Sequence, residues 1–234
     1  MRIAKVRKIS LLLVIFTLGA LLYWWFQRPP SPETVARWTM EAILRRDARR
    51  LCQLMCEAER QYVSEENLKR VLEQIHNELP YLASISLHDH PYDVTRDDVR
   101  KLRQAGFKST PTVHDVRFCY RFAHNQLVPI SPNEHSAFAK RYLLDPSTVG
   151  QGHCFRVHVN LHKGYEKRCP LVVKTLVRIV MESRAARSNL EQMLERIFWN
   201  NGVRVAFYDP NTGRVQRIQL IKVTGADGKV KYYW

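Results

Sequence analysis

The sequence predicts an α+β protein in which one N-terminal transmembrane helix precedes helices packed on a curved antiparallel sheet. Three observations lead to this prediction. Residues 9–26 form an uncharged, mostly apolar run. Apolar residues then recur at helical spacing, and nearer the C-terminus they alternate with polar residues as in strands. Helices that come first and a sheet that comes last are typical of the α+β class.

The apolar run at residues 9–26 predicts a membrane anchor. A helix of this length spans roughly 27 Å, close to the ~30 Å hydrocarbon core of a bilayer. The aromatic residues at 23–25 fit the belt at the far interface. A cleaved signal peptide is the alternative, with Thr17 and Gly19 as the small residues before the cut.

Flanking charge predicts the orientation of the anchor. Four basic residues precede the run, whereas Arg28 and Arg37 lie behind it. The positive-inside rule then keeps the N-terminus in the cytoplasm. We therefore expect a single-pass protein of the cell membrane, organised as a cytoplasmic basic stub (1–8), a transmembrane anchor (9–26), a linker (27–31) and an extracytoplasmic α+β domain (32–234) with a candidate insertion around 80–150.

Capping residues and apolar spacing predict three helices after the linker. Ser31 is a good N-cap and Pro32 suits the first helical position, so the first helix should run from about Pro32 to Arg46. A short second helix follows, and a third should begin at Ser64 and end before Pro80. The residues expected to be buried in the first helix are Val35, Trp38, Ala42 and Ile43.

Two stretches in the middle of the chain alternate like strands, namely "TVHDVRFCYRFAH" (112–124) and "HCFRVHVNLH" (153–162). The segment "CPLVVKTLVRIV" (169–180) should be the antiparallel partner or neighbour of the second strand. Residues 95–106 predict another helix. Residues 131–144 open with a capping box, and their later part fits either a strand or a helix.

The C-terminal part predicts one helix and a meander. Ser188 and Glu191 form a capping box that should open a helix through Trp199, ending near Gly202. Three strands joined by the turns "DPNTG" and "GADGK" should follow.

Charge separates this domain from an ordinary globular protein. Five of the 37 basic residues lie at or before Arg28 and all 22 acidic residues follow it, so the remainder carries a formal charge of +10. Such a surface favours anionic neighbours. The densest basic cluster is Arg45, Arg46, Arg49 and Arg50, which we consider candidate contacts for anions or lipid headgroups. A solvated helix end is the alternative interpretation.

The five cysteines define no zinc motif. Cys52 and Cys56 lie four apart on a predicted helix, and we expect them to be small buried residues. Cys154 and Cys169 flank a predicted hairpin, so they are a candidate disulfide if the domain is exported.

Part of the chain resembles a known superfamily. "SPETVARWTMEAILRRDARRLCQLM" is similar to the opening of cone-shaped domains of the nuclear transport factor 2-like superfamily, and "RIQLIKVTGADGKVKYYW" is similar to their last strands. The resemblance covers roughly residues 31–79 and 203–234. It implies a cystatin- or nuclear-transport-factor-2-like cone, in which residues 80–200 would be longer than the plain fold needs.

The resemblance leaves the function open, because members serve as small-molecule enzymes, ligand pockets, dimerisation modules and envelope assembly components. One membrane-anchored branch with a similar layout is the bitopic inner-membrane component of type IV secretion systems. Another is the membrane-proximal domain of some penicillin-binding proteins. No segment matches the acid–base motif of the enzymes in this superfamily.

Histidines supply the remaining candidate chemistry. Arg156, His158 and Asn160 share one face of a predicted strand and could line a conical pocket, where a histidine could act as a general base. His88 and His90 are weak metal candidates, with a polar loop as the favoured interpretation. No nucleophile, phosphate-loop or dinucleotide motif is present, so we name no catalytic residue and expect no cofactor.

These observations predict a membrane-anchored, extracytoplasmic binding or assembly module of the cell envelope, without enzymatic activity. Protein partners or a second copy of the chain are its expected partners, and nucleic acid is not expected. One alternative is an anchored enzyme or small-ligand carrier that uses a conical pocket. The other is a DNA-handling envelope component, which only charge supports.

Overall fold

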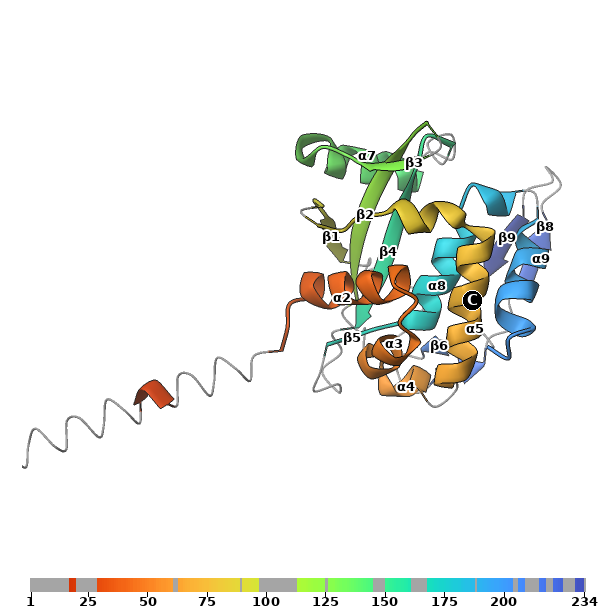
Figure 1. The fold of residues 1–234 in the computed structure, drawn as a ribbon, viewed down its shortest axis with the longest axis horizontal. Helices are drawn as coiled ribbons and strands as arrows, with labels where there is room; N and C mark the ends of the chain where they lie inside the picture. The colour runs from red at the N-terminus through yellow and green to blue at the C-terminus, as the bar shows by residue number, and fades with distance from the viewer. Residues whose placement is uncertain are drawn as a thin grey trace, which may run out of the picture. The chain divides into compact units, whose positions relative to one another are not determined.

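The computed structural model in Figure 1 describes residues 17–19, 29–60, 63–88, 90–96, 113–124, 126–144, 150–160, 168–187 and 189–203, and the backbone of four short C-terminal strands. Residues 1–30 and 31–234 form two compact units. No helix within the described residues has the length and apolar character needed to cross a membrane. The predicted anchor and the predicted helix over 95–106 lie largely outside that part of the chain.

Four helices open the domain: α2 (Pro32–Leu44), α3 (Ala48–Leu54), α4 (Glu57–Arg60) and α5 (Glu65–Glu78). Two capping predictions are confirmed. The Thr34 N–H donates to the Ser31 hydroxyl at 3.2 Å, and the Asn67 N–H donates to the Ser64 hydroxyl at 3.1 Å. The expected burial of Trp38 is wrong, because its side chain points outward and is 36% exposed.

A five-stranded antiparallel sheet follows the helices. Its strands are β1 (Asp93–Arg96), β2 (Val113–Ala123), β3 (Gln126–Pro129), β4 (Gly152–Asn160) and β5 (Cys169–Pro170). Their order is β1-β2-β4-β5, and β3 pairs with β2. β1 and β3 pair with different ends of β2, at residues 114–117 and 120–123. Strands β2 and β4 confirm the strands predicted over 112–124 and 153–162 for residues 113–123 and 153–160, and residues 112, 161 and 162 lie outside the described part.

The β2–β4 pair has two unlike faces. One face carries Val116, Phe118, Tyr120, Phe155 and Val157, which join the main hydrophobic core with α2, α5 and α8. Helix α7 (Pro132–Leu144) covers part of the other face, where its apolar side chains pack on a disulfide between the two strands. The open alternative for residues 131–144 is thereby resolved as a helix (Figure 1).

The strand expected over residues 169–180 is wrong, because α8 (Val172–Met181) is a helix and only Cys169 and Pro170 join the sheet. β-Branched residues favour strands mainly because their side chains pack well against neighbouring strands, and less because of an intrinsic backbone preference. Here the half-buried Lys174 and Arg178 lie four residues apart, so a helix gathers them on one side and buries the apolar residues on the other, where α8 packs beside β4.

The C-terminal elements are partly as predicted. Helix α9 (Leu190–Leu194) continues into the π-helix η4 (Glu195–Trp199), and the left-handed Gly202 (φ 73°) lies just beyond, as the predicted stop requires. The N-cap of α9 is Asn189, which makes no side-chain cap bond, and Ser188 of the predicted capping box lies outside the described residues. Four strands follow as two separate pairs, β6 (Ala206–Tyr208) with β7 (Val215–Arg217) and β8 (Ile221–Thr224) with β9 (Val230–Tyr233).

Two disulfides join distant parts of the domain, and neither is the predicted Cys154–Cys169 pair. Cys119 bridges to Cys154 across β2 and β4, and Cys56 bridges to Cys169. Cys56 is therefore not a simple buried residue, and Cys52 is the free cysteine. The predicted pair fails because the register places Cys169 opposite Asn160, six residues along β4 from Cys154, whereas Cys119 lies directly opposite Cys154.

We expect the two disulfides to contribute unequally to stability. The chain-entropy relation gives about 5 kcal/mol for the 113-residue separation of Cys56 and Cys169, and about 4 kcal/mol for the 35-residue separation of Cys119 and Cys154. The variants Cys56→Ala/Cys169→Ala and Cys119→Ala/Cys154→Ala test this by urea denaturation. Alkylation of the unfolded, unreduced protein should label one cysteine, and labelling of three or more would contradict the pairing.

Glu59 is a fully buried carboxylate that lies at the start of α8. Its Oε2 accepts a hydrogen bond from the Val173 N–H at 3.3 Å, so it caps a helix whose own N-cap residue, Leu171, offers no side-chain bond. Burial raises the pKa of Glu59 to about 7, although the α8 backbone N–H groups oppose the rise. The charged form of Glu59 is therefore costly to bury at neutral pH.

The pH dependence of stability should reveal this cost. The unfolded carboxyl ionises near its ordinary pKa of 4.5 and the folded one near 7, so the domain loses stability as pH rises between these values. The Glu59→Gln variant should lack this loss, and its stability relative to wild type should increase by up to about 3 kcal/mol between pH 4.5 and 8. Urea midpoints over this range measure it. Parallel pH profiles for the two proteins would refute the assignment.

Candidate functional site

The predicted pocket residues lie on the polar face of the β2–β4 pair, but this face is buried. The strand register places Asp115 opposite His158, Arg117 opposite Arg156, and Cys119 opposite Cys154. The side chains of Asp115, Arg117 and His158 are 3–7% exposed and that of Arg156 is 14% exposed. Asn160 ends β4, and its side chain lies outside the described part.

His158 contacts the carboxylate directly across from it. Nδ1 of His158 lies 2.5 Å from Oδ1 of Asp115. Burial alone would raise the pKa of Asp115, but the neighbouring His158 and Arg156 lower it below its ordinary value. Burial lowers the pKa of His158 to about 4, with Lys174 acting in the same direction. At neutral pH the pair is therefore an ionised carboxylate beside a neutral imidazole.

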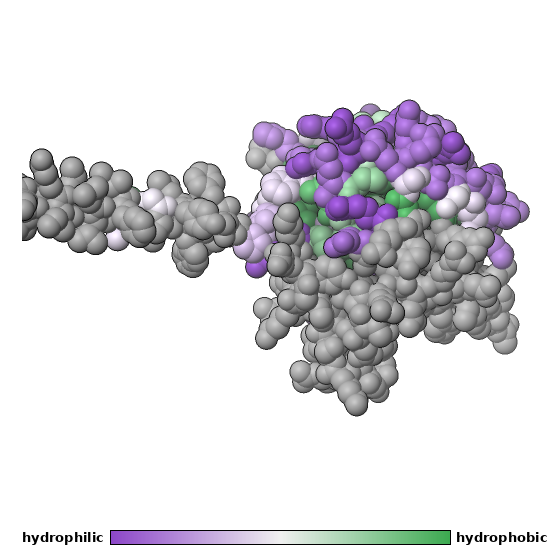
Figure 2. All heavy atoms as spheres, turned by 90° about the horizontal axis from the view of Figure 1, so that it is seen from below, coloured by the Kyte–Doolittle hydropathy of each residue, from purple (hydrophilic) through white to green (hydrophobic). Residues whose placement is uncertain are grey.

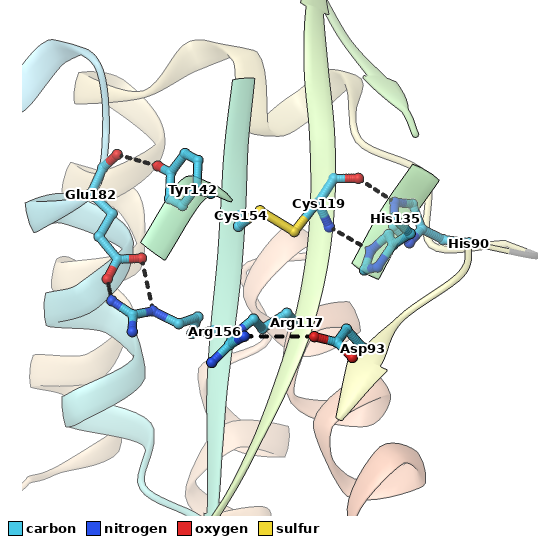
Figure 3. Close-up of a disulfide and its surroundings, with 9 residues drawn as sticks. All are labelled: His90, Asp93, Arg117, Cys119, His135, Tyr142, Cys154, Arg156 and Glu182. Carbon is cyan, nitrogen blue, oxygen red and sulfur yellow. Dashed lines mark hydrogen bonds and ion pairs between the residues drawn. A yellow bond between two sulfur atoms is a disulfide. The ribbon is translucent and has the colours of Figure 1, made fainter. Parts of the chain in front are cut away.

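Arg117 and Arg156, called here the arginine row, lie opposite each other on β2 and β4, and an acidic side chain flanks each of them (Figure 3). Arg117 lies 3.6 Å from Asp93 of β1, and Arg156 pairs with Glu182 at the end of α8. Two like charges side by side would otherwise destabilise the sheet. Burial and the nearby Arg178 lower the pKa of Arg156 to about 10, so it stays charged at neutral pH. This row is a buried ion network whose acids flank its cations.

Two buried histidines fill a gap beside the Cys119–Cys154 disulfide. On the outer side of β2, strands β1 and β3 leave Cys119 without a strand partner. The Cys119 N–H donates to Nε2 of His135 at 3.0 Å, and its carbonyl oxygen lies 2.9 Å from Nε2 of His90. Figure 3 shows both rings converging on this residue. With the Ile130 N–H, which reaches the same carbonyl oxygen at 3.5 Å, they take the place of the ladder bonds that a continuous strand would make.

These bonds determine the proton positions on both rings. A carbonyl oxygen can only accept, so Nε2 of His90 carries a proton, whereas Nε2 of His135 must be bare to accept the Cys119 N–H. Burial, and then the neighbouring His90, lower the pKa of His135 to about 4. Protonation at Nε2 of His135 would remove the acceptor for a buried N–H. The contacts of His90 and His135 with the Cys119 backbone, called here the histidine clamp, therefore require His135 to be neutral.

His135 should make the domain sensitive to acid. Its folded pKa lies below the unfolded value of 6.5, so the unfolded chain binds the proton first and stability falls as pH drops from about 6.5 to about 4. His135→Gln keeps an acceptor oxygen without titrating and should reduce this slope by the share of one group, because His158 and His153, whose pKa values burial also lowers, still contribute to it. His135→Ala should cost about 1–3 kcal/mol at pH 7 by leaving the N–H unsatisfied. Urea unfolding at several pH values measures both effects, with the exposed His124→Gln as control. An unchanged slope in His135→Gln would contradict the clamp.

The two candidate metal ligands, His88 and His90, lie in different environments. His88 is exposed in a turn, whereas His90 is buried in the clamp on Cys119. Within the described residues, no three His, Cys, Asp or Glu side chains form a group that could hold a metal ion.

The four predicted anion-contact residues gather at the corner between α2 and α3, called here the arginine corner (Arg45, Arg46, Arg49 and Arg50). All four are exposed. The corner exists because Arg46 adopts a left-handed conformation (φ 58°) and Asp47 caps α3 by accepting the Arg50 N–H at 2.8 Å. Among the described residues, none of these guanidinium groups has an ion-pair partner.

Trp38 adds an aromatic surface to the arginine corner. The Arg50 guanidinium lies 5.7 Å from the centroid of the exposed Trp38 ring. Figure 2 looks onto the domain from below, where α3 and α4 lie, and shows hydrophilic side chains over much of the described part of this face, with a smaller apolar area beside them. Tryptophan and arginine are the residues most enriched at the energetic centres of protein interfaces.

A groove of about 530 Å³ adjoins the arginine corner, between α2 and the segment that follows α5. This segment begins with the 3₁₀ helix η1 (Pro80–Ser84). From α2 the lining residues are Arg37, Glu41, Leu44 and Arg45, and from the opposite wall they are Leu82, Ala83, Ile85, Ser86, Leu87 and His88.

Arg37 holds the two walls of the groove together. Its guanidinium donates hydrogen bonds to the carbonyl oxygens of Leu87 and His90, and it lies 5.7 Å from the ring centroid of Tyr92. Arg45 has no such partner among the described residues and remains available at the edge of the groove.

Comparison with known proteins identifies no family. No protein-family model matches the sequence, and no curated protein or solved structure is significantly similar to it. The resemblance to the nuclear transport factor 2-like superfamily therefore stays a prediction.

Sequence reasoning missed the cross-strand pairs and the groove. The predicted pocket used the residues of one strand only, so it missed Asp115, which faces His158 from the neighbouring strand. Pairing Cys119 with Cys154 would have fixed the register, and this pair also sets Asp115 opposite His158. The lining residues of the second groove wall carry no pattern of their own, because their role depends on where α2 lies.

Proposed function

We propose that this chain is a membrane-anchored, extracytoplasmic binding module of the cell envelope, and that the arginine corner contacts an acidic protein partner. The anchor is the apolar run at residues 9–26, with the N-terminus in the cytoplasm. A cone-shaped sheet of the nuclear transport factor 2-like kind is part of the same proposal.

The two disulfides support the extracytoplasmic location. Stable disulfides form in oxidising compartments and are rare in the cytosol of most organisms. Both are placed to hold the fold, because one crosses the central strand pair and the other joins residues 113 positions apart. A reduced cytoplasmic form would lose both constraints.

The observation that carries the binding proposal is the exposed Trp38–Arg50 stack on the arginine corner. Elsewhere in the described domain, arginines such as Arg117 and Arg156 have acidic partners of their own. The corner instead presents four guanidinium groups to solvent around the single carboxylate of Asp47, and among the described residues none of the four is ion-paired. An acidic partner would supply the missing charges, and Trp38 would supply apolar contact area.

The polar sheet face supports the binding module rather than the pocket alternative. Asp115 and His158 are in contact, but both side chains are less than 5% exposed. A general base must reach its substrate directly or through one water. The buried pair therefore serves the fold in this proposal. DNA binding has no further support, because the corner offers one aromatic side chain rather than a series of stacking platforms.

A photo-crosslinking amino acid placed at Arg49 tests the proposed function in cells that make the full chain. We expect one discrete crosslinked protein from position 49 and none from a probe at Lys140 on α7. Adding Arg45→Glu to the chain should remove most of the product, whereas Arg141→Glu, the same charge change on α7, should not. Protease shaving of spheroplasts in the same cells reports the location of the domain.

Two outcomes would overturn the proposal. Equal crosslinking from positions 49 and 140 would mean that the corner is an ordinary solvated surface. Protection of the domain from external protease would place it in the cytoplasm and remove the extracytoplasmic assignment.

A further inference from the structure

We propose that the groove between α2 and residues 82–88 binds a peptide segment of the partner in which an apolar side chain lies next to carboxylates. This inference rests on the proposed function, because it names the chemistry of the segment that the arginine corner would help to recognise. Its own evidence is the groove, which the exposed surface of the corner does not require.

Part of the groove lining, called here the floor, is apolar and already ordered, although the polar share of the lining's exposed surface is the larger. Leu82 and Leu87 are 1% and 5% exposed, and Leu44 and Ile85 are half-buried beside them. A volume of about 530 Å³ lies within the usual range for sites that bind small ligands or anchoring side chains. An apolar side chain entering this space would remove its own surface, and the exposed apolar surface of Leu44 and Ile85, from water.

The edge of the groove is cationic. Arg37 and Arg45 provide two guanidinium groups against the one carboxylate of Glu41. Arg37 is fixed by the carbonyl oxygens of Leu87 and His90, while Arg45 has no ion-pair partner among the described residues. Arg45 also belongs to the arginine corner, so the cationic surface continues from the groove onto α3. A carboxylate beside the apolar anchor would lie at this edge.

The combination of floor and edge favours a peptide over an anionic surface. Headgroups and acidic polymers present charge alone, which the exposed corner could contact without any groove. They carry no apolar group that would pack against Leu44 and Ile85 between the two walls that Arg37 joins. A peptide with an apolar residue flanked by acidic ones matches both features.

The test is a fluorescence-anisotropy titration of the full chain in neutral-detergent micelles with two labelled hexapeptides. The first probe has two leucines between pairs of glutamates, and the second has serines in place of the leucines. We expect the leucine probe to bind at least about tenfold more tightly, because burying a leucine side chain is worth a factor of this size or more. Raised salt should weaken both probes, because both carry the same charge.

Matched variants show which part of the domain the two probes bind. Ala83→Trp fills the groove and should abolish the difference between the probes, whereas Ala137→Trp, at an exposed alanine of α7, should leave it unchanged. Arg45→Glu should weaken both probes about tenfold or more, and Lys140→Glu should have little effect. Circular dichroism of each variant checks that it is folded.

Equal affinity for the two probes would overturn the peptide assignment, and so would an effect of Ala137→Trp as large as that of Ala83→Trp. Arg45-dependent binding to phosphatidylglycerol vesicles, without a preference for the leucine probe, would show that the corner contacts lipid instead. The two proposals fail separately, because this titration uses purified chain and the crosslinking experiment uses cells. A leucine preference without a crosslinked partner would retain the groove and reject the proposed cellular role.

Discussion

The pairing of β2 with β4 is the constraint on which the rest of the domain depends. Its register places apolar side chains on one face and the Asp115–His158, Arg117–Arg156 and Cys119–Cys154 pairs on the other. A shift of one residue would turn the charged set into the main core. The register is therefore specified twice, by the hydrophobic face and by the disulfide. Helices α2, α5 and α8 pack on the apolar surface that this pairing produces.

The buried polar face is stable because each charge has a partner nearby. Removing two charges from water costs several kcal/mol per ion, and attraction offsets this only where the geometry is good. The order Asp93, Arg117, Arg156, Glu182 across the sheet places an acid on the outer side of each arginine. The neutral state of His158 and His135 avoids two further buried cations. Such a network favours one register over its alternatives more than it adds to stability.

The sequence predicted the elements whose signal is local, and it failed where tertiary context decides. Ser31 and Ser64 mark their helices because a cap needs only the next turn, and alternation marks β2 and β4. The strand expected over 169–180 failed, since an apolar β-branched run fits a buried helix as well. The candidate site was predicted in part. Its arginines were evident as a charged run, but the exposure of Trp38 and the opposite groove wall depend on how α2 packs.

The groove and the buried face are connected through a short series of bonds. Arg37 of α2 binds the carbonyl oxygens of Leu87 and His90, and His90 binds the carbonyl oxygen of Cys119. The wall of the groove is thus tied to the central strand at the residue that carries the disulfide. A site whose walls are held in this way exists before its ligand arrives, so little conformational entropy is lost on binding. The histidine clamp and the cross-strand disulfide, which touch no ligand, thereby support the surface that we propose does the binding.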